Sequence, residues 1–146
     1  MASDSKTLHR AISALQRLSD LFVQRREALA RDADLTVPQW RLLEEISTEH
    51  FMPSMFAQRR SVSAAAVSKL VRSLLDRQLV SVAVGSNDRR HRKFALTAKG
   101  KRSLEALRRA RLRAIEKVWG DIPAAELERF ARFGEELSAR LETYVD

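Results

Sequence analysis

The side chains in this sequence that could do chemistry are mostly cations, and they gather in the middle of the chain. Residues 88–93 read Asp-Arg-Arg-His-Arg-Lys, a run in which a single acid stands among Arg and Lys. Lys69 and Arg72 lie a short distance before this run, beside the hydroxyl group of Ser68. Guanidinium and ammonium groups bind phosphate, and Arg and Ser side chains also hydrogen-bond to base edges. These residue types predict contacts to a nucleic acid.

Catalysis would require an acid, a base or a nucleophile that converge on one point. The three histidines, His9, His50 and His91, are scattered over different predicted elements. The sequence has no cysteine, no metal-ligand spacing and no glycine-rich phosphate loop. We therefore expect no enzyme, with no catalytic residues, no metal site and no cofactor.

The helix predicted for residues 63–77 would display the first group of polar side chains. Its apolar residues recur at the spacing of one buried helical stripe, at Val67, Leu70, Val71, Leu74 and Leu75. The opposite face would point into solvent and carries Ala65, Ser68, Lys69, Arg72 and Asp76. Ser63 is the predicted N-cap. The break just before it, at residues 60–63, is interpreted as the turn between two helices.

A β-hairpin is predicted directly after this helix. At residues 80–84, Val alternates with Ser or Ala, which is the period of a half-buried strand. Residues 85–88 supply turn chemistry, and Phe94 and Leu96 resume the alternation on a return strand. A helix with a basic face followed by a basic-tipped hairpin is typical of a winged helix-turn-helix. In that architecture the helix enters a major groove and the hairpin reaches along the backbone or into the minor groove.

The two ends of the chain are predicted to be helices with long apolar stripes. The N-terminal helix would be capped by Asp4 or Ser5 and would end at residues 31–34, and it either packs in a core or lies in a dimer interface. The C-terminal helix would begin at Pro123. Its apolar seam advances by alternating steps of three and four residues, at Leu127, Phe130, Gly134, Leu137, Leu141 and Tyr144. Because a small central module cannot cover both stripes, we expect a homodimer formed through both termini.

Three further helices are predicted between these ends, in addition to residues 63–77. One begins with Thr36 as its N-cap and Gln39 at the capping-box position. A short helix starts at Pro53. The third would be capped by Thr97 and would end at Trp119, with Gly120 as a left-handed terminator. The sequence thus predicts a mainly α fold with one small β-hairpin.

The composition limits the class of protein. A chain of 146 residues suits one domain, and 45% hydrophobic with 32% charged residues describes a soluble globular protein. The net charge of +8 favours a polyanionic partner, although ribosomal or membrane-surface proteins share such a charge. No apolar run could span a bilayer, and no signal-peptide core is present. We therefore expect no membrane association and a cytoplasmic location.

Three segments together resemble the multiple-antibiotic-resistance regulator (MarR) family over nearly the whole chain. They are residues 35–40 (Leu-Thr-Val-Pro-Gln-Trp), residues 63–74 and residues 88–100, which end in Leu-Thr-Ala-Lys-Gly. The resemblance implies a homodimeric winged-helix repressor or activator, bound to a pseudopalindromic double-stranded DNA operator and often released by a small aromatic or phenolic effector. It also implies that residues 63–72 are the recognition helix, that Arg90 enters the minor groove and that Asp88 orients it.

Three departures from the family pattern affect the expected operator more than the expected fold. Ala65 and Ala66 stand where the family often has hydroxyl residues. Val82 replaces an Arg that is common on the first strand of the wing, and Phe56 stands in the usual Leu-Ala pair of the third helix. With fewer hydrogen-bond donors on the recognition helix, direct base readout would rest on fewer groups.

The expected domain is a single winged-helix regulator over residues 1–146, with a DNA-binding lobe at about 36–100 and dimerisation helices at about 4–32 and 101–146. Phosphate contacts are expected from Lys69, Arg72 and Arg89, and base contacts from Ser68 and Arg72. Arg90 would read the width of the minor groove. The full set of expected DNA-binding residues is Ser63, Ala64, Ala65, Ser68, Lys69, Arg72, Asp88, Arg89 and Arg90.

Several alternatives stay open at this point. Trp40 either packs in the core or forms one wall of an effector pocket, with Arg17 as a partner for a carboxylate. The arginines at positions 108, 109, 111 and 113 are either a solvated or salt-bridged helix face or contacts to phosphate or an effector. A basic architectural nucleic-acid protein without an effector is the main rival function. A ligand-binding enzyme is a weaker rival, because no catalytic constellation supports it.

Overall fold

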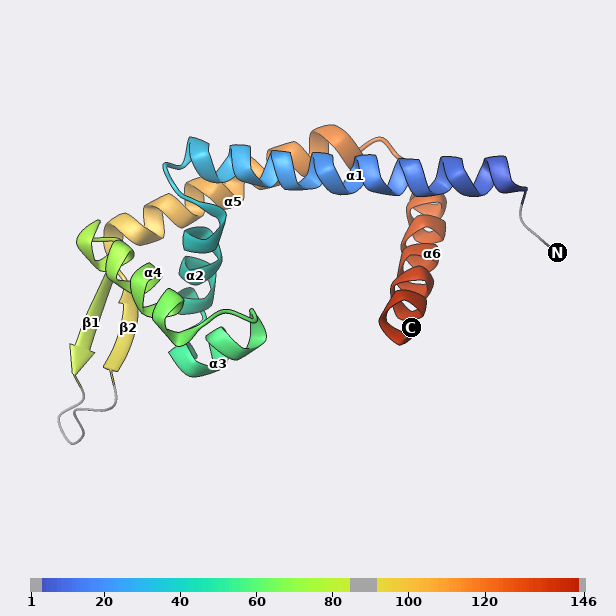
Figure 1. Ribbon diagram of the computed structural model, residues 1–146. Coiled ribbons are helices and arrows are strands. Elements are labelled where there is room, and N and C mark those ends of the chain that lie inside the picture. Colours follow the sequence, from blue (N-terminus) through green and yellow to red (C-terminus); the bar gives the residue numbers. More distant parts are fainter. Residues whose placement is uncertain (1–3, 85–91, 145–146) are drawn as a thin grey trace. The chain divides into compact units, whose positions relative to one another are not determined.

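The computed structural model describes residues 4–84 and 92–144, and this part of the chain is mainly helical with one hairpin, as predicted (Figure 1). Its elements, in chain order, are α1 (Ser5–Asp32), α2 (Val37–Ser47), α3 (Pro53–Arg59), α4 (Ala64–Asp76), β1 (Val80–Val84), β2 (Arg92–Leu96), α5 (Ala98–Trp119) and α6 (Ala124–Thr143). The chain divides into two compact units, Met1–Ala110 and Arg111–Asp146. The winged helix-turn-helix elements all belong to the first unit.

The helix starts follow the capping residues that the sequence predicts. Thr36 and Gln39 form a reciprocal capping box at the start of α2, with bonds of 2.9 and 3.3 Å. Ser63 Oγ accepts a hydrogen bond from Ala66 N at 3.0 Å and caps α4. Thr97 Oγ1 accepts one from Gly100 N, also at 3.0 Å, and caps α5. Each cap satisfies an amide that the first helical turn leaves without a partner.

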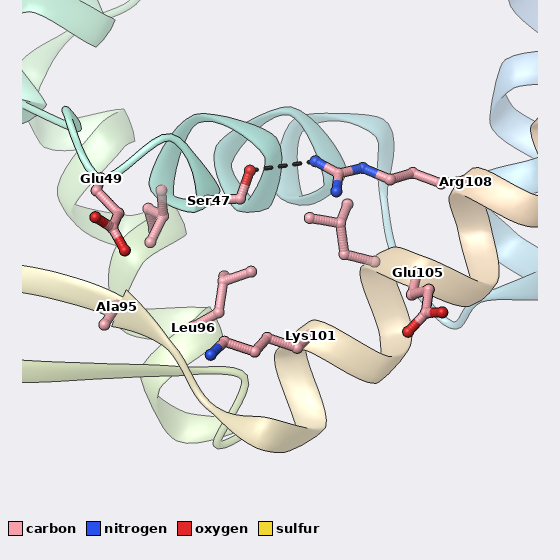
Figure 2. Close-up of a pocket in the computed structure, with 9 residues that line it drawn as sticks. Ser47, Glu49, Ala95, Leu96, Lys101, Glu105 and Arg108 are labelled. Atoms are coloured by element: carbon pink, nitrogen blue, oxygen red, sulfur yellow. Dashed lines mark hydrogen bonds between the residues drawn. The ribbon is translucent and has the colours of Figure 1, made fainter.

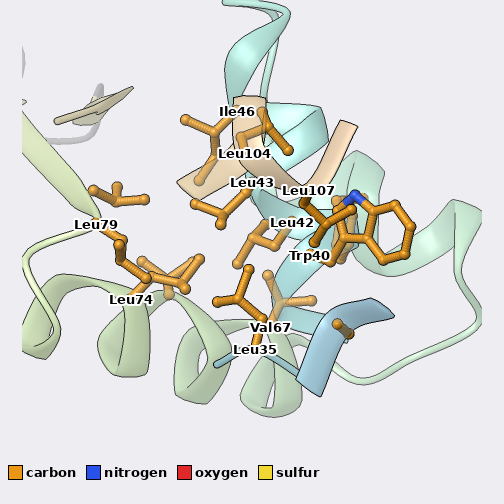
Figure 3. Packing of buried hydrophobic residues seen from close by; sticks show 14 of the residues in the cluster. Leu35, Trp40, Leu42, Leu43, Ile46, Val67, Leu74, Leu79, Leu104 and Leu107 are labelled. Atoms are coloured by element: carbon orange, nitrogen blue, oxygen red, sulfur yellow. The ribbon is translucent and has the colours of Figure 1, made fainter. Parts of the chain in front are cut away.

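One hydrophobic core holds the first unit together (Figure 3). The centre of α2 supplies Leu42, Leu43 and Ile46, which are at most 1% exposed. Around it pack buried residues from the other helices and from the start of β1, including Val67, Leu74, Leu79, Leu104 and Leu107. This core presses the apolar stripe of α4 inward and thereby leaves the polar stripe of the same helix in solvent.

The hairpin is present as predicted, but its first strand is less buried than predicted. β1 and β2 are antiparallel, with Val80 opposite Leu96 and Val82 opposite Phe94. Val80 is buried, whereas Val82 is 42% exposed, so the expectation of a half-buried strand is wrong beyond the base of the hairpin. The two strands extend away from the helices (Figure 1), and beyond the base of the hairpin it is Phe94 of β2, rather than Val82 opposite it, that packs against the core.

Gly120 corrects another expectation. No glycine in the described residues has a positive φ, so Gly120 is not a left-handed terminator. Its amide instead donates to the carbonyl of Glu116 at 2.9 Å, and a Cβ at position 120 would lie 2.5 Å from that same oxygen. Glycine at the end of α5 is explained by this close approach rather than by the left-handed conformation.

The apolar stripe of α1 stays largely exposed, so the core-helix alternative fits only the end of this helix. Ala30 is the residue of α1 that is buried. The stripe before it is 40–50% exposed at Leu8, Ile12, Leu15, Leu18 and Phe22. Exposed apolar area of this extent is characteristic of a surface that another molecule covers.

The second unit, described by itself, also has exposed apolar side chains. The rings of Trp119 and Phe130 lie 6.3 Å apart, which joins the end of α5 to the start of α6. α6 has no buried residue, and Phe130, Phe133 and Leu141 are each more than half exposed. The three- and four-residue seam is therefore present on the helix, but the described chain does not cover it.

Candidate nucleic-acid interface

α4 presents the polar face that the sequence predicts. The six expected contact residues of this segment are all exposed: Ser63, Ala64, Ala65, Ser68, Lys69 and Arg72. Residues 65, 68, 69 and 72 follow the i, i+3, i+4, i+7 spacing and therefore share one side of the helix. Val67, Val71 and Leu74 are buried on the opposite side. The face is thus held outward by the packing of its own helix.

The turn between α3 and α4 fixes the start of the exposed helix. Ser61 has a positive φ of 53°, which an L-residue adopts only at some cost. The amide of Val62 then donates to the carbonyl of Ala57 at 3.0 Å. Ser63 follows in an extended conformation as the N-cap. This geometry produces the abrupt change of direction that a helix-turn-helix requires.

The far end of α4 is anchored by a polar network that the sequence did not predict. Gln39 Nε2 donates to Ser73 Oγ at 3.3 Å, although only the capping role of Gln39 was expected. Arg77 Nη2 reaches Asp34 Oδ2 at 3.3 Å, and Lys99 Nζ donates to the carbonyl of Arg77 at 3.0 Å. These contacts join residues far apart in the sequence, so no local pattern could have indicated them.

The wing is described only at its two strands. Arg92 and Lys93 are exposed on β2, where they pair with Val84 and Ala83 across the hairpin. Asp88, Arg89 and Arg90 lie outside the described residues. Their expected roles at the minor groove and the phosphates therefore stay predictions.

Trp40 lies in the core of the first unit and is 7% exposed (Figure 3). Its indole Nε1 donates to Glu44 Oε1 at 3.2 Å, so its polar atom is satisfied within α2. Arg17, the expected carboxylate partner, is exposed on α1. The structure does not bring these two side chains together in a described pocket, and their role in effector binding stays a prediction.

Arg108 connects α5 to α2, which favours the salt-bridged alternative for the start of the arginine cluster. Its Nε and Nη2 bond to the two carboxylate oxygens of Glu44 at 3.2 and 2.5 Å, and Nη2 also donates to Ser47 Oγ at 3.2 Å. The hydrogen bond to Glu44 raises the pKa of Arg108 above its ordinary value. Both side chains are partly exposed, so the pair adds about 1 kcal/mol or less to stability.

The other arginines of this cluster divide between the two units. Arg109 pairs with Glu105 one helical turn away at 3.4 Å, an arrangement that holds the side chain on the surface of α5. Arg111 and Arg113 are exposed and belong to the second unit. Contact of these residues with phosphate or an effector stays a prediction.

A surface hollow of about 370 Å³ lies between α2, β2 and the first half of α5 (Figure 2). Its walls include Ser47, Glu49, Leu96, Lys101 and Arg108. Neither Arg17 nor Trp40 lines it. Arg108 points across the hollow toward Ser47 and is already bonded there, which leaves Lys101 as a cation at its rim (Figure 2).

Arg41 follows Trp40 on α2 and has an unusual electrostatic environment. Partial burial lowers the pKa of Arg41, and the positive charges of Arg26 and Arg60 lower it further. The neighbouring acid Glu45 is bonded to Arg59 instead. The positive charges of Arg26 on α1 and Arg60 at the end of α3 thus act on Arg41 of α2, and this concentration of positive charge is attractive to an anion.

The described residues contain neither a metal site nor a membrane-spanning helix. No group of three or more His, Cys, Asp or Glu side chains there could hold a metal ion. Within the same ranges, every helix is too short or too polar to cross a membrane.

An exposed helix seated after a tight turn, followed by an antiparallel hairpin, defines a winged helix-turn-helix protein. The sequence model of the MarR family matches residues 33–91, which include α2, α3, α4 and β1. Over this part of the chain the sequence is similar to that family.

Solved structures share this fold at low sequence identity. A MarR family transcription regulator has a TM-score of 0.80 at 16% identity, over 94% of this chain and 92% of that one. Staphylococcus aureus MarR, solved with salicylate and kanamycin, has a TM-score of 0.76 at 14% identity, over 97% and 96%. A mutant of S. aureus MepR bound to an oligodeoxyribonucleotide has a TM-score of 0.60 at 20% identity, over 94% and 99%. No curated protein sequence matches the chain.

Proposed function

We propose that this chain is a transcription regulator of the MarR family, which binds a pseudopalindromic DNA operator as a homodimer and represses transcription until a small aromatic or phenolic effector releases it. The observation that carries the proposal is the exposed polar face of α4, held outward by the buried stripe behind it. The S. aureus MepR structure that shares the fold was solved on an oligodeoxyribonucleotide, which supports DNA as the partner. Because its proposed partner is DNA, we also propose that the protein is cytoplasmic.

The proposed DNA contacts follow from the chemistry of each exposed side chain. Lys69 and Arg72 would contact phosphates, and they would make the affinity fall with added salt. Ser68 and Arg72 can reach base edges in the major groove. Among the residues outside the described ranges, Arg89 would add a phosphate contact, while Arg90, oriented by Asp88, would enter the minor groove.

Dimerisation is supported by the apolar surface that the chain leaves exposed. The stripe of α1 and the seam of α6 both present large aliphatic and aromatic side chains to solvent. A two-fold axis between two copies would cover such surfaces and would set two recognition helices about one helical turn of DNA apart. Dimerisation helices at about residues 4–32 and 101–146 therefore remain our assignment.

The effector is proposed to be an aromatic anion. Staphylococcus aureus MarR was solved with salicylate, which has this chemistry. In the present chain the positive charges of Arg26 and Arg60 act on Arg41, which follows Trp40 in the sequence, and Arg17 stands exposed on α1. We assign Arg17 and Trp40 to effector binding and infer that the positive charge around Arg41 attracts the carboxylate of the effector.

Salicylate should weaken operator binding if this assignment holds. We expect a several-fold rise in the apparent Kd for the operator at millimolar salicylate, and a smaller rise for Arg17→Gln. Fluorescence anisotropy of a labelled operator measures both, with Arg10→Gln as the matched change of an exposed α1 arginine. Equal responses of the two variants would remove Arg17 from the effector site.

Arg72→Ala should change which half-site sequences are preferred. Arg72 lies on the exposed face of α4, where a guanidinium group can bond to a guanine edge and discriminate against other bases by about 1–3 kcal/mol. Selection from random duplex DNA, run in parallel on the native protein and the variant, measures the preference. Arg129→Ala is the control, because that arginine is exposed on α6, outside both α4 and the arginine cluster of α5.

The outcomes separate the proposed function from its rivals. Sequence-indifferent binding by the native protein would favour the architectural nucleic-acid protein instead. Suppose instead that the native protein enriches one operator and that Arg72→Ala keeps the same sequence preference but binds every duplex more weakly. Arg72 would then contact phosphates only.

A further inference from the structure

We propose that Ala65, with Ala64 beside it, recognises the C5-methyl groups of thymine in the major groove. The inference rests on the proposed function, because it takes α4 as the recognition helix. It adds the class of base that the operator should place opposite the first turn of this helix.

The position of the two alanines supports this role. Ala64 and Ala65 are the first two residues of α4, and both are exposed. Ala65 lies on the same side of the helix as Ser68, Lys69 and Arg72. In helix-turn-helix proteins, the N-terminal residues of the recognition helix are those that contact base edges. The methyl groups of these alanines would therefore meet bases before the polar side chains do.

The first turn of α4 has little side-chain hydrogen-bonding capacity for bases. Ser63 Oγ already accepts the bond from Ala66 N, and the next polar side chain on the helix is Ser68. An alanine opposite a purine edge or a cytosine amino group would leave that polar group without its water or a replacement partner, which costs free energy. A methyl group is the one major-groove feature of a base pair that an alanine side chain contacts favourably, and only thymine carries it.

The operator should therefore hold thymine opposite the first turn of α4 in each half-site. Replacing one such thymine by uracil removes its methyl group and should weaken binding about fourfold, because a methyl group stabilises the complex about as much as one buried methylene. 5-Methylcytosine keeps the methyl group, so it should be tolerated better than cytosine at the same position. Thymines that face other parts of the protein should show no such effect.

The test begins with selection of an operator from random duplex DNA. Each thymine of the half-site is then replaced singly by uracil, and Kd is measured at one salt concentration. Ala65→Gly should bind more weakly and should no longer distinguish thymine from uracil at the position opposite residue 65. Ala125→Gly is the matched control, since Ala125 is an exposed alanine at the same second position of α6.

Each result has a definite meaning. If no sequence is enriched, the proposed function fails. If an operator is enriched but every uracil duplex binds as well as its parent, the methyl inference is overturned and the proposed function stands. If replacing thymine by uracil weakens binding equally for the native protein and for Ala65→Gly, the methyl inference is also overturned, because the thymine methyl group would then act through DNA shape. Should Ala65→Gly melt early by circular dichroism, Ala65→Ser retains the helix and repeats the comparison, with the same absence of discrimination expected.

Discussion

Gly100→Ala is expected to lower the free energy of unfolding by about 1–3 kcal/mol, the usual cost of overpacking against neighbours that cannot move. A Cβ at position 100 would lie 2.0 Å from the carbonyl oxygen of Leu79 and 3.0 Å from its carbonyl carbon. These are backbone atoms, so no side chain can rotate away. The same carbonyl accepts the amide of Thr97 at 3.1 Å, which holds the start of α5 against the end of the α4–β1 connection.

Urea unfolding followed by circular dichroism measures this destabilisation. Arg102→Ala is the control, because Arg102 is exposed near the start of the same helix. This surface substitution should change the free energy of unfolding by less than about 0.5 kcal/mol. A change of less than about 0.5 kcal/mol for Gly100→Ala, the range of ordinary surface substitutions, would show that α5 can shift away from Leu79.

Leu137→Glu combined with Leu141→Glu is expected to convert the proposed dimer into a monomer and to weaken operator binding about 100-fold or more. Two half-sites held by one dimer gain affinity from the high effective concentration of the second contact, which is typically worth a factor of 10² to 10⁴. Both leucines lie on the α6 seam, which the described chain does not bury. Four carboxylates brought into a two-fold interface would repel one another and would lose solvation.

Analytical ultracentrifugation gives the oligomeric state, and anisotropy gives the operator affinity. The control pair is Ala139→Glu with Thr143→Glu, which adds the same charges at the same spacing on the opposite side of α6, where both residues are exposed. We expect this pair to remain dimeric. A dimer of normal stability for the Leu137 and Leu141 variant would exclude the α6 seam from the interface.

Features that depend on neighbours within one helical turn could be predicted from the sequence. The caps at Thr36, Ser63 and Thr97 bond to amides three residues further along, as expected. The buried and exposed sides of α4 follow from periodicity alone, because one face of the helix is apolar. The exposed face that we assign to DNA was therefore visible before the fold was known.

The sequence was less informative where distant parts of the chain meet. Arg108 is bonded to Glu44, and Arg77 to Asp34, across separations of 64 and 43 residues. Val82 follows a strand pattern yet stays exposed, because burial depends on whether another layer covers that face. Gly120 is the residue type expected at a left-handed helix terminator, but its φ is not positive. Glycine is required there because a Cβ would lie too close to the carbonyl oxygen of Glu116.

The sequence by itself therefore determined the helices, the hairpin, the basic face of α4 and the resemblance to the MarR family. Each of these depends on side-chain periodicity, on capping or on motif spacing, which are local properties of the chain. Only the tertiary structure decided that Trp40 is buried, that Arg108 is paired and that Gly100 touches the Leu79 carbonyl. Those contacts arise when close packing brings distant segments together, and no local pattern encodes the distance between them.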